Sequence, residues 1–179
     1  MRANPKHLRV EKYDKEKFEQ RREKHEFPKA YKELAMCKMC GAVYYKKSWR
    51  HNFKNSDYRK LLRKFPINWT ICPADRMIKN GQFEGKLTVK NIPHKYKEEL
   101  IDLIAGFGNR AYQKDSQHRI INIKNLAGNS LLITTTENQM ALQMAKKIKN
   151  AFKKKEILKV SLSPRPSDVI YVTMEFIGI

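Results

Sequence analysis

The stretch "GKLTVKNIPHKYKEELIDLIAGF", residues 85–107, carries the pattern of a strand followed by the pattern of a helix. Residues 85–92 alternate apolar and polar side chains, which is typical of a strand with one buried face. Pro93 then opens a segment in which Glu98 and Glu99 come early, as they do in the first turn of a helix. Apolar residues recur there at helical spacing, at Tyr96, Leu100, Ile101, Leu103, Ile104 and Phe107.

The sequence after this pair continues with alternating elements. "HRIINIKNLAGNSLLITTT", residues 118–136, predicts a hairpin around an Ala-Gly-Asn turn. Thr136 stands three residues before Gln139, the spacing of a capping box, and the helix expected over 137–155 has an apolar face. "EILKVSLS", residues 156–163, and "DVIYVTMEFIG", residues 168–178, predict two more strands, separated by Pro164 and Pro166.

The resulting order, β-α-β-β-α-β-β, predicts an α+β domain over residues 83–179. Its first six elements match the split β-α-β arrangement, in which two helices cover one face of an antiparallel sheet. We therefore expect a ferredoxin-like domain with an extra C-terminal strand.

Two short motifs upstream indicate a small metal-binding module over residues 36–82. Cys37 and Cys40 form a Cys-x-x-Cys pair, and Cys72 and Asp75 form a second pair that reads Cys-Pro-Ala-Asp. Two such turns brought together complete a tetrahedral zinc site of the structural type, and an aspartate oxygen can supply the fourth ligand. A module this small and polar needs such a staple to close its core.

Other interpretations of these residues remain open at this point. Cysteine is often a small buried apolar residue, and Asp75 beside Arg76 is compatible with an ordinary surface ion pair. His51 and His94 are alternative fourth ligands. Three cysteines, two of them only three positions apart, do not fit the disulfide framework of a secreted protein.

The charge of the chain favours a polyanionic partner. Thirty-eight Lys and Arg oppose eighteen Asp and Glu, which gives a net charge of +20. In residues 36–65 the cations are interleaved with aromatic rings, which suits phosphate neutralisation and base stacking, although the rings are equally suited to forming the core of the module. The expected RNA-binding residues are Lys38, Tyr44, Tyr45, Lys46, Lys47, Trp49, Arg50, Lys54, Arg59, Lys60, Arg63 and Lys64.

The remaining composition indicates the cellular compartment of the protein and the class of ligand that it binds. Residues 1–35 hold eleven basic and seven acidic side chains, which predicts a basic disordered tail. They lack the apolar core of a secretory signal, and nothing in the chain approaches a membrane span, so we expect a cytoplasmic protein. No glycine-rich phosphate loop is found in the sequence, and we expect no small-molecule substrate.

Three segments together carry a family resemblance: "CKMCGAVYYKKSW", "CPADRMIKNGQFEGKLTVKN" and "LLITTTENQMALQMAKKIKNAFKKK". Over residues 36–178 the chain resembles a small bacterial family of zinc-ribbon proteins. That family is itself similar to the N-terminal part of the archaeal and eukaryotic adaptor that exports the large ribosomal subunit from the nucleus. The resemblance implies a zinc-binding protein associated with ribosomes or RNA. It transfers ligand roles to Cys37, Cys40 and Cys72, whereas Asp75 replaces the family's fourth cysteine.

We therefore expect a non-enzymatic factor that docks on ribosomal RNA through the basic module and the tail, on an idle or hibernating ribosome or on a maturing subunit. A DNA-binding, transcription-linked zinc ribbon is the first alternative, although no base-reading helix is evident in the module. A metal-dependent nuclease that uses His51 is the second. The strands of the C-terminal domain lack the aromatic signature of an RNA-binding sheet, so we expect that domain to be a scaffold.

Overall fold

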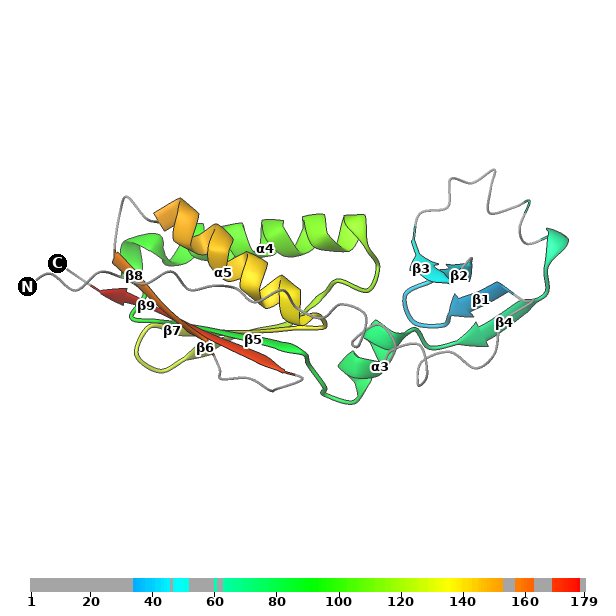
Figure 1. The fold of residues 1–179 in the computed structure, drawn as a ribbon, viewed down its shortest axis with the longest axis horizontal. Coiled ribbons are helices and arrows are strands. Elements are labelled where there is room, and N and C mark those ends of the chain that lie inside the picture. Colours follow the sequence, from blue (N-terminus) through cyan, green and yellow to red (C-terminus); the bar gives the residue numbers. More distant parts are fainter. Residues whose placement is uncertain are drawn as a thin grey trace, which may run out of the picture. The chain divides into compact units, whose positions relative to one another are not determined.

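The computed structural model describes residues 34–45, 47–51, 60, 63–152 and 169–177, and the backbone alone for residues 157–162. These residues form two β-sheets and three α-helices, so the expected α+β class is confirmed (Figure 1). The predicted tail lies outside the described residues except for Leu34 and Ala35, which belong to the first strand. None of the described helices is long and apolar enough to span a bilayer.

The first sheet has four short strands in the order β3-β2-β1-β4. They are β1 (Leu34–Cys37), β2 (Val43–Tyr45), β3 (Ser48–Arg50) and β4 (Ile67–Thr70), and the helix α3 (Pro73–Lys79) follows β4. Both neighbours of β2 pair with it in antiparallel fashion, while β4 runs parallel to β1. Gly41 has φ of 72° in the β1–β2 turn, a conformation that favours glycine.

The core of this small sheet is limited. Among the described residues, its buried apolar cluster consists of Leu34, Met36 and Val43, with Tyr45 and Phe65 packed at its margin. Tyr44 and Trp49 are also buried, and their ring centroids lie 5.5 Å apart. The small sheet therefore uses rings that the sequence also offered for RNA stacking as its own apolar filling.

The second sheet has five strands in the order β6-β7-β5-β9-β8, with two helices over one face (Figure 1). Its strands are β5 (Gly85–Lys90), β6 (Ile120–Leu126), β7 (Ser130–Thr135), β8 (Ile157–Leu162) and β9 (Ile170–Ile177). The helices are α4 (Lys97–Lys114), which follows a 3₁₀ turn at His94–Tyr96, and α5 (Asn138–Phe152). The element order predicted from the sequence is therefore confirmed.

The arrangement of the last two strands differs from a simple ferredoxin-like sheet. In the split β-α-β arrangement, the strand after the second helix lies beside the first strand. Here β9 occupies that place, parallel to β5, and β8 is displaced to the edge beside β9. Buried Val172, Met174 and Phe176 alternate along β9 and join the core under the helices, which accounts for its central position.

Apolar side chains from both helices fill the space above this sheet. Leu100 and Ile104 of α4 and Met144, Ile148 and Phe152 of α5 are buried in one cluster with the inward residues of β5, β7 and β9. This pattern agrees with the helical spacing that predicted the two faces.

The predicted capping box at Thr136 is wrong. The helix α5 begins at Asn138, and the Thr136 hydroxyl instead donates to the carbonyl of Gln117 over 2.6 Å. Its oxygen also accepts the backbone N–H of Arg119 over 2.9 Å. Thr136 therefore holds the loop between α4 and β6, which contributes to the site described next.

Candidate metal centre

The parallel pairing of β1 and β4 brings the two cysteine motifs together. Cys37, the last residue of β1, lies opposite Thr70, two residues before Cys72. The turn after β1 closes with a hydrogen bond from the Gly41 N–H to the Cys37 carbonyl, 3.0 Å, and it carries Cys40 back toward the same point. Residues far apart in sequence thus meet at one end of the small sheet.

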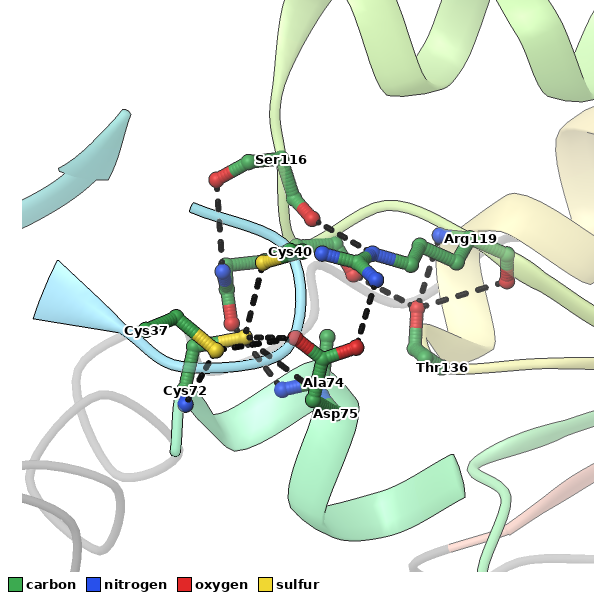
Figure 2. A network of polar contacts seen from close by, with 9 residues as sticks. Cys37, Cys40, Cys72, Ala74, Asp75, Ser116, Arg119 and Thr136 are labelled. Carbon is green, nitrogen blue, oxygen red and sulfur yellow. Dashed lines mark hydrogen bonds and ion pairs between the residues drawn. The ribbon is translucent and has the colours of Figure 1, made fainter. Parts of the chain in front are cut away.

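The second motif is the start of a helix. Pro73 occupies the first turn of α3, where its missing N–H costs nothing, and Cys72 is the N-cap residue. The Cys72 sulfur accepts the N–H of Asp75 over 3.4 Å. Asp75 lies in the first helical turn, and the Cys-Pro-Ala-Asp spacing directs both side chains toward the first motif (Figure 2).

The four expected ligand atoms converge. One ligand atom from each of Cys37, Cys40, Cys72 and Asp75 lies within 4.8 Å of all the others. The sulfurs of Cys40 and Cys72 are 3.8 Å apart, and Oδ2 of Asp75 lies 3.0 Å from the Cys37 sulfur and 3.2 Å from the Cys72 sulfur. Two sulfurs on a tetrahedral zinc with bonds of about 2.3 Å lie roughly 3.8 Å apart, so the cluster fits such an ion with little movement.

Most of the cluster is buried, and backbone donors suit its sulfurs to negative charge. Cys37, Cys72 and Asp75 are buried, and Cys40 is partly exposed. The Cys72 N–H donates to the Cys37 sulfur over 3.3 Å, in addition to the bond from Asp75 N–H to Cys72. Such donors stabilise a thiolate relative to a thiol.

The ionisable groups influence one another. Burial raises the pKa of Cys72 and of Cys40, and a hydrogen bond to Asp75 adds to the rise in both cases. Burial would also raise the pKa of Asp75, but hydrogen bonds from the three thiols and the charge of Arg119 outweigh it and lower that pKa. The site thus holds one carboxylate and three thiols, and each thiol must lose its proton to bind a cation as a thiolate.

The interpretation of Asp75 and Arg76 as a surface pair is wrong. Asp75 is 4% exposed and its Oδ1 accepts from Nη1 of Arg119 over 2.7 Å. Arg76 is exposed and its guanidinium points to the Ile71 carbonyl at 3.5 Å. No signal in the sequence identified Arg119, because the fold brings it to Asp75 across 44 residues.

Neither alternative histidine joins the cluster. His51 donates through Nε2 to the Tyr112 carbonyl, and its ring lies 4.3 Å from the Tyr112 ring. His94 Nε2 lies 2.9 Å from the side-chain nitrogen of Asn129. Over the part of the chain that the structure describes, the four residues of the two motifs are the candidate metal ligands.

A closed set of four protein ligands is characteristic of structural zinc sites, whereas catalytic sites keep one position open. Three sulfurs favour a soft or borderline cation such as Zn²⁺ over Mg²⁺ or Ca²⁺. The arrangement can therefore cross-link β1, the turn that follows it and α3 through one ion.

The predicted RNA-binding residues divide into three groups. The cations that the structure describes are exposed: Lys38, Lys47, Arg50, Lys60, Arg63 and Lys64. Lys46, Lys54 and Arg59 lie outside the described residues. The rings of Tyr44 and Trp49 are each 9% exposed and Tyr45 packs on Phe65 at 6.1 Å, so these three offer little surface for stacking.

Trp69 is an exposed aromatic residue that the sequence analysis missed. It lies on β4 and is 52% exposed. The alternation of apolar and polar residues in Ile67–Thr70 would place Trp69 on the same face as Ile67, which packs against the small core, so the pattern points to the wrong face.

Comparison of the chain with protein-family models and with curated proteins gives no match. Function is therefore inferred from the residues and their geometry.

Proposed function

We propose that the chain is a zinc-binding RNA-docking factor, without enzymatic activity, whose target is ribosomal RNA. The observation that carries this proposal is the convergence of three thiols and a carboxylate within a module whose sequence has almost no acidic residues. Between residues 36 and 82 the acidic residues are Asp57 and Asp75, and Asp75 is buried in the cluster.

Zinc would supply the rigidity that RNA docking requires. Bound to Cys37, Cys40, Cys72 and Asp75, it would fix the turn after β1 and the start of α3. The exposed cations of this module would then meet phosphates as a shaped surface, with less ordering cost at the moment of binding.

Trp69 is the favoured stacking residue in this proposal. Its exposed ring lies on β4, in the module that carries Arg63 and Lys64 just upstream. Stacking of an unpaired base on an aromatic ring contributes about 1–3 kcal/mol by alanine substitution. Single-stranded loops of ribosomal RNA present such bases, which favours structured RNA over duplex DNA.

The closed ligand set and the engaged His51 support a role without metal-assisted hydrolysis. A nuclease metal keeps open positions and is paired with a positioned base. His51 is occupied by the backbone and ring of Tyr112. The five-stranded domain, which we take to be a ferredoxin-like variant with an inserted strand, would act as the scaffold that carries the module.

The proposal is tested by co-sedimentation of the tagged full-length chain with ribosomes on sucrose gradients, at low and high salt, in growing and starved cells. The expected result is co-migration that weakens with salt, and its timing separates idle ribosomes from maturing subunits. A chain that stays at the top of every gradient would contradict ribosome docking.

Matched variants locate the surface in the same assay. The double variant Arg63→Glu with Lys64→Glu should reduce co-migration strongly. Adding Trp69→Ala to it should reduce co-migration further, at every salt concentration. Lys146→Glu with Lys149→Glu reverses the same charge on exposed residues of α5 and is the control. An equal loss from the α5 pair would place the RNA surface on the five-stranded domain instead.

A further inference from the structure

The carboxylate of Asp75 faces two different partners. Its Oδ2 lies 3.0 and 3.2 Å from the sulfurs of Cys37 and Cys72, and its Oδ1 accepts from Nη1 of Arg119 over 2.7 Å. Figure 2 shows the carboxylate between the sulfurs on one side and the guanidinium on the other. Both members of the ion pair are largely buried, with side-chain exposures of 6% for Asp75 and 13% for Arg119.

Arg119 is held in place from its own side. Its Nε donates to the Ser116 carbonyl over 2.8 Å, and its backbone N–H is fixed by the Thr136 hydroxyl. The guanidinium carbon lies 5.1 Å from the centre of the Tyr112 ring. A long side chain that is fixed at so many points presents its N–H groups to Asp75 without a large entropic cost.

From these contacts we infer that Arg119 is a positioning residue of the metal site, and that Asp75 takes the place of a fourth cysteine because it must bind the metal and Arg119 at once. This inference rests on the proposed metal binding. A carboxylate has two oxygens, so that one can bind the metal while the other accepts from Arg119. Outer partners of this kind orient a ligand and tune its affinity for the metal.

Charge gives the pair a second role. Three thiolates and a carboxylate around a divalent cation leave two negative charges in excess, and burying them is unfavourable. Arg119 removes one of these charges. Its Nη2 is buried and has no hydrogen-bond partner among the described residues, and the Cys40 sulfur lies beside the guanidinium (Figure 2). A metal-bound thiolate at Cys40 is the acceptor that this N–H lacks.

The pair also joins the ribbon module to the five-stranded domain. Asp75 belongs to α3 and Arg119 to the loop that precedes β6, and both lie in the unit Glu33–Ile179. The residue before Asp75 contributes a parallel link, because the Ala74 N–H donates to Oε1 of Gln117 over 3.0 Å. Metal bound at Asp75 would therefore order the loop of residues 115–119 as well as the ribbon.

The test measures binding of Zn²⁺, and of Co²⁺ as a spectroscopic probe, to the full chain. Arg119→Met, which keeps the length and removes the charge, should weaken metal binding about 10- to 100-fold, the range found for outer partners of metal ligands. Arg119→Lys should restore part of the affinity. Arg76→Met removes an exposed arginine next to Asp75 in sequence and should bind metal as the unaltered chain does.

The same substitution made in an Asp75→Cys variant distinguishes an effect of Arg119 on the carboxylate from an effect on the stability of the fold. In Asp75→Cys the fourth ligand no longer offers Arg119 a second oxygen, although the charge of Arg119 still offsets that of the thiolates, so adding Arg119→Met should weaken metal binding less than it does in the unaltered chain. Hydrogen exchange of Leu131 and Ile133, which are buried in the other sheet, checks that each variant is folded. The Co²⁺ spectrum of Arg119→Met should differ from that of the unaltered chain, because Asp75 would bind in a different geometry.

The possible outcomes separate the role of Arg119 from the proposed binding of a metal. Metal binding by Arg119→Met with unchanged affinity and Co²⁺ spectrum would overturn the role of Arg119 and leave the metal site standing. An equal loss when Arg119→Met is added to the unaltered chain and to the Asp75→Cys variant would also overturn it, because the effect would not pass through the carboxylate. A chain that binds no metal in any form would overturn the metal site itself and leave Asp75 and Arg119 as a buried ion pair.

Discussion

The two sheets differ in what holds them together. In the described residues, the five-stranded sheet and its helices share a core of fifteen buried apolar residues. The four-stranded sheet has a cluster of three, Leu34, Met36 and Val43, together with the buried rings of Tyr44 and Trp49. Burial of one such side chain stabilises a fold by about 1.5–3 kcal/mol, while ordering one residue costs about 1–2 kcal/mol, so these few side chains do not offset the ordering of four strands and their turns. The small sheet needs a cross-link, and a metal ion bound by the cluster at the end of β1 would provide it.

Metal removal should therefore produce the strongest response. Chelation, or Cys72→Ser at a residue with no exposed surface, should unfold the small sheet and leave the large sheet folded. Hydrogen exchange followed by mass spectrometry checks this region by region. Amides of β1 to β4 should lose protection, while those of β5 and β7 keep it. Equal protection of the small sheet with and without metal would show that its apolar core is sufficient.

A substitution in the apolar core of the large sheet should destabilise that sheet without affecting metal binding. Phe152 is fully buried between Tyr96 and Phe176, with both ring-centroid distances at 5.6 Å. Phe152→Ala should lower the free energy of unfolding by about 3–5 kcal/mol and leave the zinc content of the chain unchanged. Thermal and denaturant unfolding measure the loss. Lys149→Ala, an exposed change on the same helix, should stay within about 0.5 kcal/mol of the unaltered chain.

The sequence predicted the large sheet better than the small one, and the reason is the length of the pattern. The face of α5 repeats over four turns, so Met144, Ile148 and Phe152 were placed in the core correctly. The strands of the small sheet are three or four residues long, too short for alternation to identify a buried face. Trp49 and Trp69 could not be separated into core and surface for that reason.

The metal cluster was predictable in part. The spacing of Cys37, Cys40, Cys72 and Asp75 identified the four residues that the structure brings together. Arg119 was not predictable, because its approach to Asp75 depends on how the α4–β6 loop is held by Thr136 and Ser116. The position of β9 between β5 and β8 was missed for a similar reason, since strand order is set by packing across the sheet rather than by the pattern within one strand.

A decrease in pH should destabilise the small sheet by weakening the binding of a metal ion at the cluster. Burial raises the pKa of Cys72 and Cys40, and the Cys37 thiol donates to Asp75, so all three cysteines release a proton when they bind zinc as thiolates. Asp75, whose pKa is lowered, releases none near pH 7. Three released protons imply that zinc affinity falls by up to about 1,000-fold for each unit of decrease in pH. Competition with a chromophoric chelator between about pH 6 and 8 measures the slope, and an affinity independent of pH would contradict thiol ligation.

Two glycines, one in the large sheet and one in its helix α4, should give the weakest effects. A Cβ on Gly85 would lie 2.3 Å from Oγ1 of Thr135 and 2.9 Å from the carbonyl oxygen of Glu137, so Gly85→Ala should cost about 1–3 kcal/mol. A Cβ on Gly106 in α4 would meet the flexible Arg110 side chain at 3.3 Å. Gly106→Ala should therefore stabilise the helix by about 0.5–1 kcal/mol. Unfolding of both variants in urea compares the signs, and stabilisation by Gly85→Ala would contradict the close packing of β5 against the start of α5.

Whether a metal ion holds the small sheet together is decided most simply by native mass spectrometry of the intact chain, with and without prior chelation. We expect one zinc ion per chain, lost in Cys72→Ser, together with loss of amide protection in residues 34–50 when the metal is removed. A chain that carries no metal after exposure to zinc, and that still protects those amides, would contradict a metal-stapled module.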